Sequence, residues 1–185
     1  MSHDFHARRP LLALACLWPW LVLAAEPLSG VFDADALWRG ADAGLDLAAC
    51  PSFGETRLTG LEQLVPIAVP VLAGGAVDAS PLSGDCRGWI AAAPDYRVHL
   101  EDAGRRLELS FAPEVIDAAV ILVVNRPDGR WSCSPAASDT VALQLDSAAA
   151  GQYDIWVGTP APDTWLPGTL RLASPPGLPA REAQR

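Results

Sequence analysis

Polar and apolar residues alternate with a period of two along much of this chain. The pattern is clearest in residues 96–100, 107–111, 141–145 and 153–157. Such alternation is typical of β-strands that bury one face and expose the other. In the last segment, Tyr153, Ile155 and Val157 share one face, and Trp156 lies on the opposite one. No segment after residue 47 has the period and length of an amphipathic helix, so the pattern predicts an all-β domain.

Other segments refine this prediction. Residues 118–124 form a continuous apolar run, which indicates a strand covered on both faces. The Arg-Pro-Asp-Gly stretch at 126–129 is typical of a turn and predicts a hairpin that continues into residues 131–133. Pro66 and Pro70 place the extended segment 65–71 at a sheet edge, because proline cannot donate to a central ladder.

The sequence therefore predicts roughly eight to ten short strands in one antiparallel, jelly-roll-like β-sandwich. We place this single domain at residues 47–173. A transitional N-terminal segment (26–46) precedes it, and a Pro-rich, charged tail (174–185) follows it.

Residues 1–25 have the layout of a secretory signal peptide. Arg8 and Arg9 precede an apolar run over residues 11–23, and Ala24-Ala25 offer small residues for cleavage. The run is too short for a comfortable membrane span, so we expect cleavage rather than anchoring. The mature chain is then periplasmic or extracellular, with no transmembrane segment. The net charge of -9 argues against nucleic acid as a partner.

Export places the cysteines that remain after the signal where disulfides form: Cys50, Cys86 and Cys133. Three is an odd number, so one cysteine stays free or pairs with another chain. A bond between Cys86 and Cys133 would contribute about 4 kcal/mol in the chain-entropy model. That makes a structural bridge the preferred reading over a reactive thiolate. Cys50 is then buried and inert, exchanges with another cysteine, or links two chains.

The rival hypothesis is a small cysteine hydrolase. Cys86 stands in a Gly-x-Cys-x-Gly motif, and His99, the single histidine after the signal, could act with Glu101 or Asp102. However, a nucleophile elbow needs a strand, a sharp turn and then a helix, and no long helix fits after Gly88. His99 reads instead as a solvent-facing strand residue. With one histidine and no Cys-x-x-Cys pair, zinc spacing is also missing. We therefore predict no catalytic residue, no metal site and no cofactor.

Aspartates and tryptophans are the remaining candidates for binding. The turn aspartates are too dispersed for a calcium loop and read as solvated side chains: Asp78, Asp85, Asp95, Asp128, Asp139 and Asp154. Trp156, together with Trp131 and Trp89, is a candidate binding surface if its strand face is open. Packing of Trp156 beneath a loop or against the N-terminal segment is the preferred alternative.

Several blocks resemble the bacterial pre-peptidase C-terminal domain, a small β-sandwich, over about residues 50–173. They are residues 73–80, 84–90, 93–96, 120–124, 126–133 and 151–159. The resemblance implies a non-catalytic appendage and supports pairing of Cys86 with Cys133. Some relatives carry acidic residues after the second cysteine, whereas residues 134–139 here hold only Asp139, which puts a calcium role of that loop in doubt. We expect a binding or accessory module whose partner is an envelope protein or a glycan.

Overall fold

The structure, a computed structural model, describes residues 44–59 and 66–174. The predicted signal peptide, nearly all of the N-terminal segment and the predicted tail beyond Ser174 lie outside the described residues. Twelve strands form the described fold. They are β1 (Glu55–Leu58), β2 (Ile67–Ala73), β3 (Val77–Asp78), β4 (Trp89–Ile90), β5 (Tyr96–Leu100), β6 (Arg105–Pro113), β7 (Ala119–Asn125), β8 (Trp131–Cys133), β9 (Ala137–Ser138), β10 (Val141–Ala148), β11 (Gly151–Gly158) and β12 (Leu166–Ala173).

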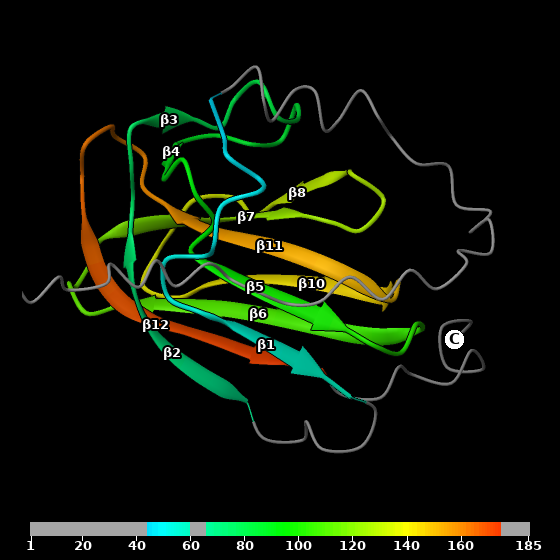
Figure 1. Cartoon of the computed structure of the whole chain (residues 1–185). Helices are drawn as coiled ribbons and strands as arrows, with labels where there is room; N and C mark the ends of the chain where they lie inside the picture. Colours follow the sequence, from blue (N-terminus) through cyan, green and yellow to red (C-terminus); the bar gives the residue numbers. More distant parts are fainter. Residues whose placement is uncertain (1–43, 60–65, 175–185) are drawn as a thin grey trace, which may run out of the picture.

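Two sheets form the layers of a β-sandwich (Figure 1). One sheet has the order β1-β5-β11-β7-β8, with β9 also paired to β7, and the other has the order β10-β6-β12-β2. A small β3-β4 ribbon lies beside them. The all-β sandwich prediction is therefore confirmed. One pairing departs from the antiparallel expectation: β1 runs parallel to β5.

The main hydrophobic core lies between the two sheets and follows the alternating pattern. Leu107, Leu109 and Phe111 of β6 point into it from one sheet, and Ile155 and Val157 of β11 do so from the other. Each of these side chains is almost fully buried, and such burial contributes about 1.5–3 kcal/mol per residue. The period of two is thus a direct consequence of which face of each strand meets the opposite sheet.

β7 is buried on both faces, as its continuous apolar run predicts. Val120, Leu122 and Val124 face the main core. Ile121 and Val123 face outward into a second core, which lies on the outer face of the β7-β11 sheet. The second core consists of Leu45, Ala79, Leu82, Cys86, Ile90, Ile121, Val123, Trp131 and Trp156.

A chain segment covers this outer face and closes the second core. We call residues 77–91, which comprise β3, β4 and the loop between them, the covering segment. Leu82, Cys86 and Ile90 are its fully buried contributions. The six-stranded sheet is therefore covered on both sides over the region of β7 and β11.

The predicted hairpin and edge strand are also present. The turn between β7 and β8 is closed by the Arg126 amide, which donates to the Arg130 carbonyl at 2.9 Å. β2 is the terminal strand of its sheet, with Pro70 in register with Thr169 of β12. Within the described residues, no helix is long and apolar enough to cross a membrane.

Candidate functional site

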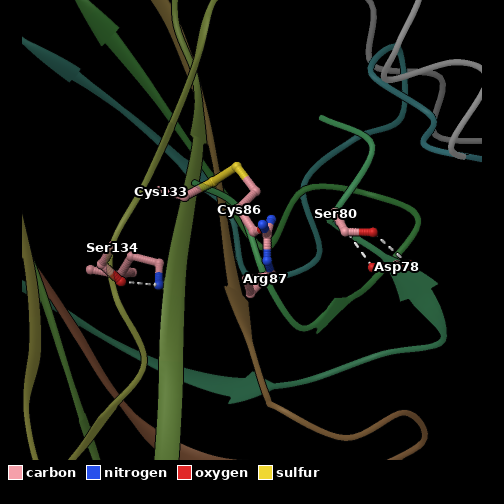
Figure 2. The surroundings of a disulfide bond; sticks show 7 residues. Asp78, Ser80, Cys86, Arg87, Cys133 and Ser134 are labelled. Carbon is pink, nitrogen blue, oxygen red and sulfur yellow. Dashed lines mark hydrogen bonds between the residues drawn. A yellow bond between two sulfur atoms is a disulfide. The ribbon is translucent and has the colours of Figure 1, made fainter. Parts of the chain in front are cut away.

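A disulfide joins the covering segment to the β-sandwich. It links Cys86 to Cys133 of β8, with their Cα atoms 5.2 Å apart, well within the range for such bonds (Figure 2). Cys86 is fully buried. The pairing that the family resemblance implied is therefore present. Cys50 is also disulfide-bonded, and it is exposed, so the prediction of a buried, inert cysteine is wrong.

Hydrogen bonds fix both sides of this bridge. After Cys133, the Ser134 hydroxyl accepts from the Leu122 amide at 2.8 Å, which ties the chain back to β7. At the start of the covering segment, Asp78 accepts from the Ser80 amide and hydroxyl, each at 2.8 Å. At its end, Trp89 and Thr159 exchange two backbone hydrogen bonds of 2.8 and 3.0 Å. The segment is thus anchored to the sandwich at two places, by the disulfide and by the Trp89–Thr159 pair.

The residues of the rival hydrolase do not come together. Starting from Cys133, His99 lies three strand spacings across the sheet and four residues along β11. This corresponds to roughly 20 Å between their Cα atoms. Since Cys86 is bonded to Cys133, its sulfur is both occupied and remote from the imidazole. His99 Nε2 lies instead 3.5 Å from Glu55 Oε2.

The proposed acidic partners of His99 are also placed elsewhere. Glu101 lies 3.9 Å from the Arg57 guanidinium, and Asp102 is exposed in the β5–β6 loop. Neither contact resembles the orienting hydrogen bond that a catalytic histidine needs.

The prediction of a tryptophan binding surface is wrong for two of its three residues. Trp156 is fully buried, and Trp131 is 9% exposed, with the two ring centroids 5.5 Å apart. The physical reason is the covering segment, which occupies the strand face that had to be open. Trp156 thus packs under a loop, as the alternative hypothesis had it. Its indole Nε1 has no hydrogen-bond partner among the described residues. Trp89 is half-buried at the edge of the covering segment.

Polar side chains cover the rest of the outer face of the six-stranded sheet. Arg97 Nε donates to Asp154 Oδ1 at 2.6 Å, and both side chains are largely buried. The same guanidinium donates to the carbonyls of Leu47 and Ala49 at 3.1 and 3.2 Å. Arg97 therefore helps to fix the chain before β1 onto the sheet, together with backbone hydrogen bonds such as that from the Ser52 amide to the Pro94 carbonyl at 2.8 Å.

Asp95 is the most deeply buried carboxyl group of the described residues. It is 1% exposed, and its Oδ2 accepts from the Val157 amide at 2.7 Å. Desolvation raises the pKa of Asp95 to about 7, against the lowering effect of that hydrogen bond. The side chain bonds the end of β11 and is turned away from solvent, so it is not a solvated turn residue.

The turn aspartates lie in separate environments. Asp78 bonds Ser80, Asp128 bonds Arg126, and Asp154 bonds Arg97. Residues 44–59 and 66–174 contain no group of three or more His, Cys, Asp or Glu side chains arranged to hold a metal ion.

A shallow groove of about 290 Å³ lies on the outer face of the four-stranded sheet. Glu108 and Ser110 of β6, Gln144 of β10 and Arg171 of β12 are among its lining residues. These groups could hydrogen-bond a small polar ligand. The groove contains no aromatic side chain on which a sugar ring could stack.

The chain was compared with protein families, with curated proteins and with solved structures. No protein-family model matches it, and no curated protein is significantly similar. Similar solved structures include the pre-peptidase C-terminal domain of a collagenase from Bacillus anthracis, with 14% identity and a TM-score of 0.37. That match covers 68% of this chain and 98% of the collagenase domain. A pre-peptidase C-terminal domain is thus among the matches, as the sequence resemblance predicts.

Another match is CorA, a surface-associated copper-binding protein of Methylomicrobium album BG8. It has 9% identity and a TM-score of 0.40, and the match covers 68% of this chain and all of CorA. Both similarities are too low to transfer a function, so the function has to be argued from the residues of this chain.

Proposed function

We propose that this protein is an exported, non-catalytic β-sandwich that serves as a binding or accessory module for a component of the bacterial envelope. The observation that carries the proposal is the Cys86–Cys133 disulfide, which takes the one candidate nucleophile out of reach and rigidifies the outer face of the sheet. A rigid scaffold with fixed loops suits recognition, because little conformational freedom is lost on binding.

The same disulfide supports export, because such bonds persist in oxidising compartments. Residues 1–25 have the basic, apolar and small-residue sections of a secretory signal peptide, which would direct the chain to export. We propose that cleavage after Ala25 releases the mature chain into the periplasm or beyond. Fractionation of a bacterial host, followed by N-terminal sequencing, tests this, and intact chain in the cytoplasm would contradict it.

The binding role is tested with the exported protein purified without reductant. We expect it to be retained either by insoluble cell-wall glycan or by immobilised envelope proteins, and these two arms distinguish the two partner classes. Retention on neither material contradicts the proposal.

The rival enzyme is tested on the same sample. A thiol-directed alkylating reagent is expected to leave Cys86 and Cys133 unmodified until reductant is added, because both sulfurs are bonded. Modification of Cys86 in the unreduced protein, together with hydrolytic activity that is lost on Cys86→Ser, would favour the hydrolase.

A further inference from the structure

Large apolar side chains remain exposed at one end of the sandwich. Of the five exposed large hydrophobic residues in the described part of the chain, four belong to this end: Ile116 (85% exposed), Trp165 (51%), Val115 (47%) and Leu72 (41%). We call these four residues the apolar end. Single exposed apolar residues are ordinary, but a cluster of them indicates an interaction surface.

The strand register brings these four residues together. Leu72 at the end of β2 is in register with Pro167 of β12, two residues after Trp165. The Pro167 carbonyl also accepts from the Glu114 amide at 2.9 Å, which places Val115 and Ile116 beside the same turn. In Figure 1, the end of β2, the β6–β7 loop and the β11–β12 loop all lie on the left side of the molecule.

Hydrogen bonds hold the loops of the apolar end in place. The Asp163 amide donates to the Gly75 carbonyl at 3.0 Å, and the Thr159 hydroxyl donates to the Ala161 carbonyl at 2.9 Å. In the other loop, the Ala118 amide donates to the Val115 carbonyl at 3.4 Å. Two prolines (Pro160 and Pro162) stiffen the β11–β12 connection further. The apolar side chains are therefore presented on ordered backbone, which lowers the entropic cost of docking.

The charged side chains within the two loops of the apolar end are of one sign. Glu114, Asp117 and Asp163 lie in its two loops, and residues 114–118 and 159–165 contain no arginine, lysine or histidine. An acidic rim repels anionic lipid and also a second copy of this acidic chain. It complements a partner whose apolar contact residues are flanked by cationic side chains.

We propose that the apolar end is the docking surface of this module and that it binds an apolar protein segment flanked by arginine or lysine. The proposal rests on the binding role argued above and adds the surface and the chemistry of the partner. Ile116 and Trp165 are the apolar contacts, and Glu114 with Asp163 select for positive charge.

The probe is a random peptide library displayed on phage, selected on the unreduced exported protein. We expect the enriched peptides to combine large apolar residues with arginine or lysine. Affinities of the synthesised peptides are then measured for the wild type and for variants. Ile116→Ser and Glu114→Arg should each weaken binding about tenfold or more, whereas Ile116→Leu should retain it.

Asp102→Arg is the matched control for Glu114→Arg. Asp102 is exposed at the opposite end, about 25 Å away along the length of β6. Asp102→Arg makes the same change of charge as Glu114→Arg. Because it lies far from the apolar end, it should change the peptide affinity by no more than about twofold. Circular dichroism checks that each variant is folded, and the exposure of Ile116 makes Ile116→Ser a safe substitution.

Three results overturn the proposal: no enriched peptide, enrichment of acidic peptides, or affinities that Ile116→Ser and Glu114→Arg leave unchanged. Its failure is distinguishable from that of the binding role. If the wild type and Ile116→Ser are retained equally on envelope material, the apolar end is not the docking surface, but the protein is still a binding module. Retention of neither rejects the binding role itself.

Discussion

Asp95 shows how one buried side chain gives the whole fold a dependence on pH. Its carboxyl group holds the Val157 amide at 2.7 Å inside the protein, and burial raises its pKa to about 7. In the unfolded chain the same group titrates near 3.8. Between these two values the folded protein keeps a proton that the unfolded chain has lost, so folding is linked to proton uptake.

The sign of this linkage gives a prediction. The contribution of Asp95 is fully present below about pH 4 and is lost as the pH rises to about 7. The free energy of unfolding therefore falls by up to about 4 kcal/mol across this window. Asp95→Asn should remove this slope, because the amide oxygen still accepts from Val157 and carries no titrating proton. Urea unfolding at several pH values measures the effect, with the exposed Asp102→Asn as control. A variant Asp95→Asn that keeps the wild-type slope would contradict the assignment.

The Arg97–Asp154 ion pair leads to a second prediction at this scale. Only 12% and 5% of the two side chains is exposed, so Asp154→Ala leaves a guanidinium buried without its carboxylate. We expect a loss of about 3–5 kcal/mol. The matched control is Asp146→Ala. Asp146 Oδ1 lies 2.8 Å from Arg106 Nε, but the Asp146 side chain is 66% exposed. This substitution should cost at most about 1 kcal/mol. Equal losses of stability in the two variants would show that burial does not determine how much these ion pairs stabilise the protein.

At the scale of elements, two glycines of the covering segment have different structural roles. Gly88 has a φ of +109°, and a Cβ there would lie 2.7 Å from the Thr159 carbonyl oxygen and 2.8 Å from Ile121. Gly84, four residues earlier, lies in open space without a positive φ. Thus only the second glycine of the Gly-Asp-Cys-Arg-Gly motif is required for close approach to β11 and β7.

This difference is testable with one substitution at two positions. Gly88→Ala should destabilise the protein by more than about 1 kcal/mol, because it combines a left-handed backbone with a steric clash. Gly84→Ala should be neutral or slightly stabilising, since it only restricts the unfolded chain. Thermal unfolding of the two variants measures the contrast. A neutral Gly88→Ala would mean that the covering segment can shift away from Thr159.

The elements that the sequence predicts well are those whose pattern depends on local geometry. Strands β5, β6, β10 and β11 alternate because one face meets the main core, and the β7–β8 turn is encoded by Pro127 and Gly129. The outer face of β11 was harder to interpret. By its position along the strand, Trp156 fits either an open face or the preferred interpretation of packing beneath a loop, and the distant covering segment is what makes it a core residue.

The apolar end escaped prediction for a similar reason. Val115 and Ile116 follow Phe111 in an apolar-rich stretch and look like a continuation of a strand. Their exposure arises because β6 ends at Pro113 and the chain turns through Asp117, which adopts a φ of +60°. Trp165 is separated from them by many residues, and only the pairing of β12 with β2 and β6 brings them together.

At the scale of the whole molecule, the two cores differ in what holds them closed. The main core joins two complete sheets through many buried side chains. The second core is closed by the covering segment and by Leu45 before β1, and the anchors of the covering segment are backbone hydrogen bonds and the Cys86–Cys133 bridge. That bridge closes a loop of 47 residues and contributes about 4 kcal/mol in the chain-entropy model.

We therefore predict that reduction opens the second core before the sandwich unfolds. Trp131 and Trp156 lie in the second core, so their fluorescence should shift to the red as water reaches them. Amide exchange should accelerate in residues 77–91 but stay slow in β6 and β12, whose side chains belong to the main core. The double variant Cys86→Ala/Cys133→Ala should behave in the same way without reductant. Simultaneous loss of protection in β6, β12 and the covering segment would instead show that the two cores form one cooperative unit, with the disulfide stabilising the entire sandwich.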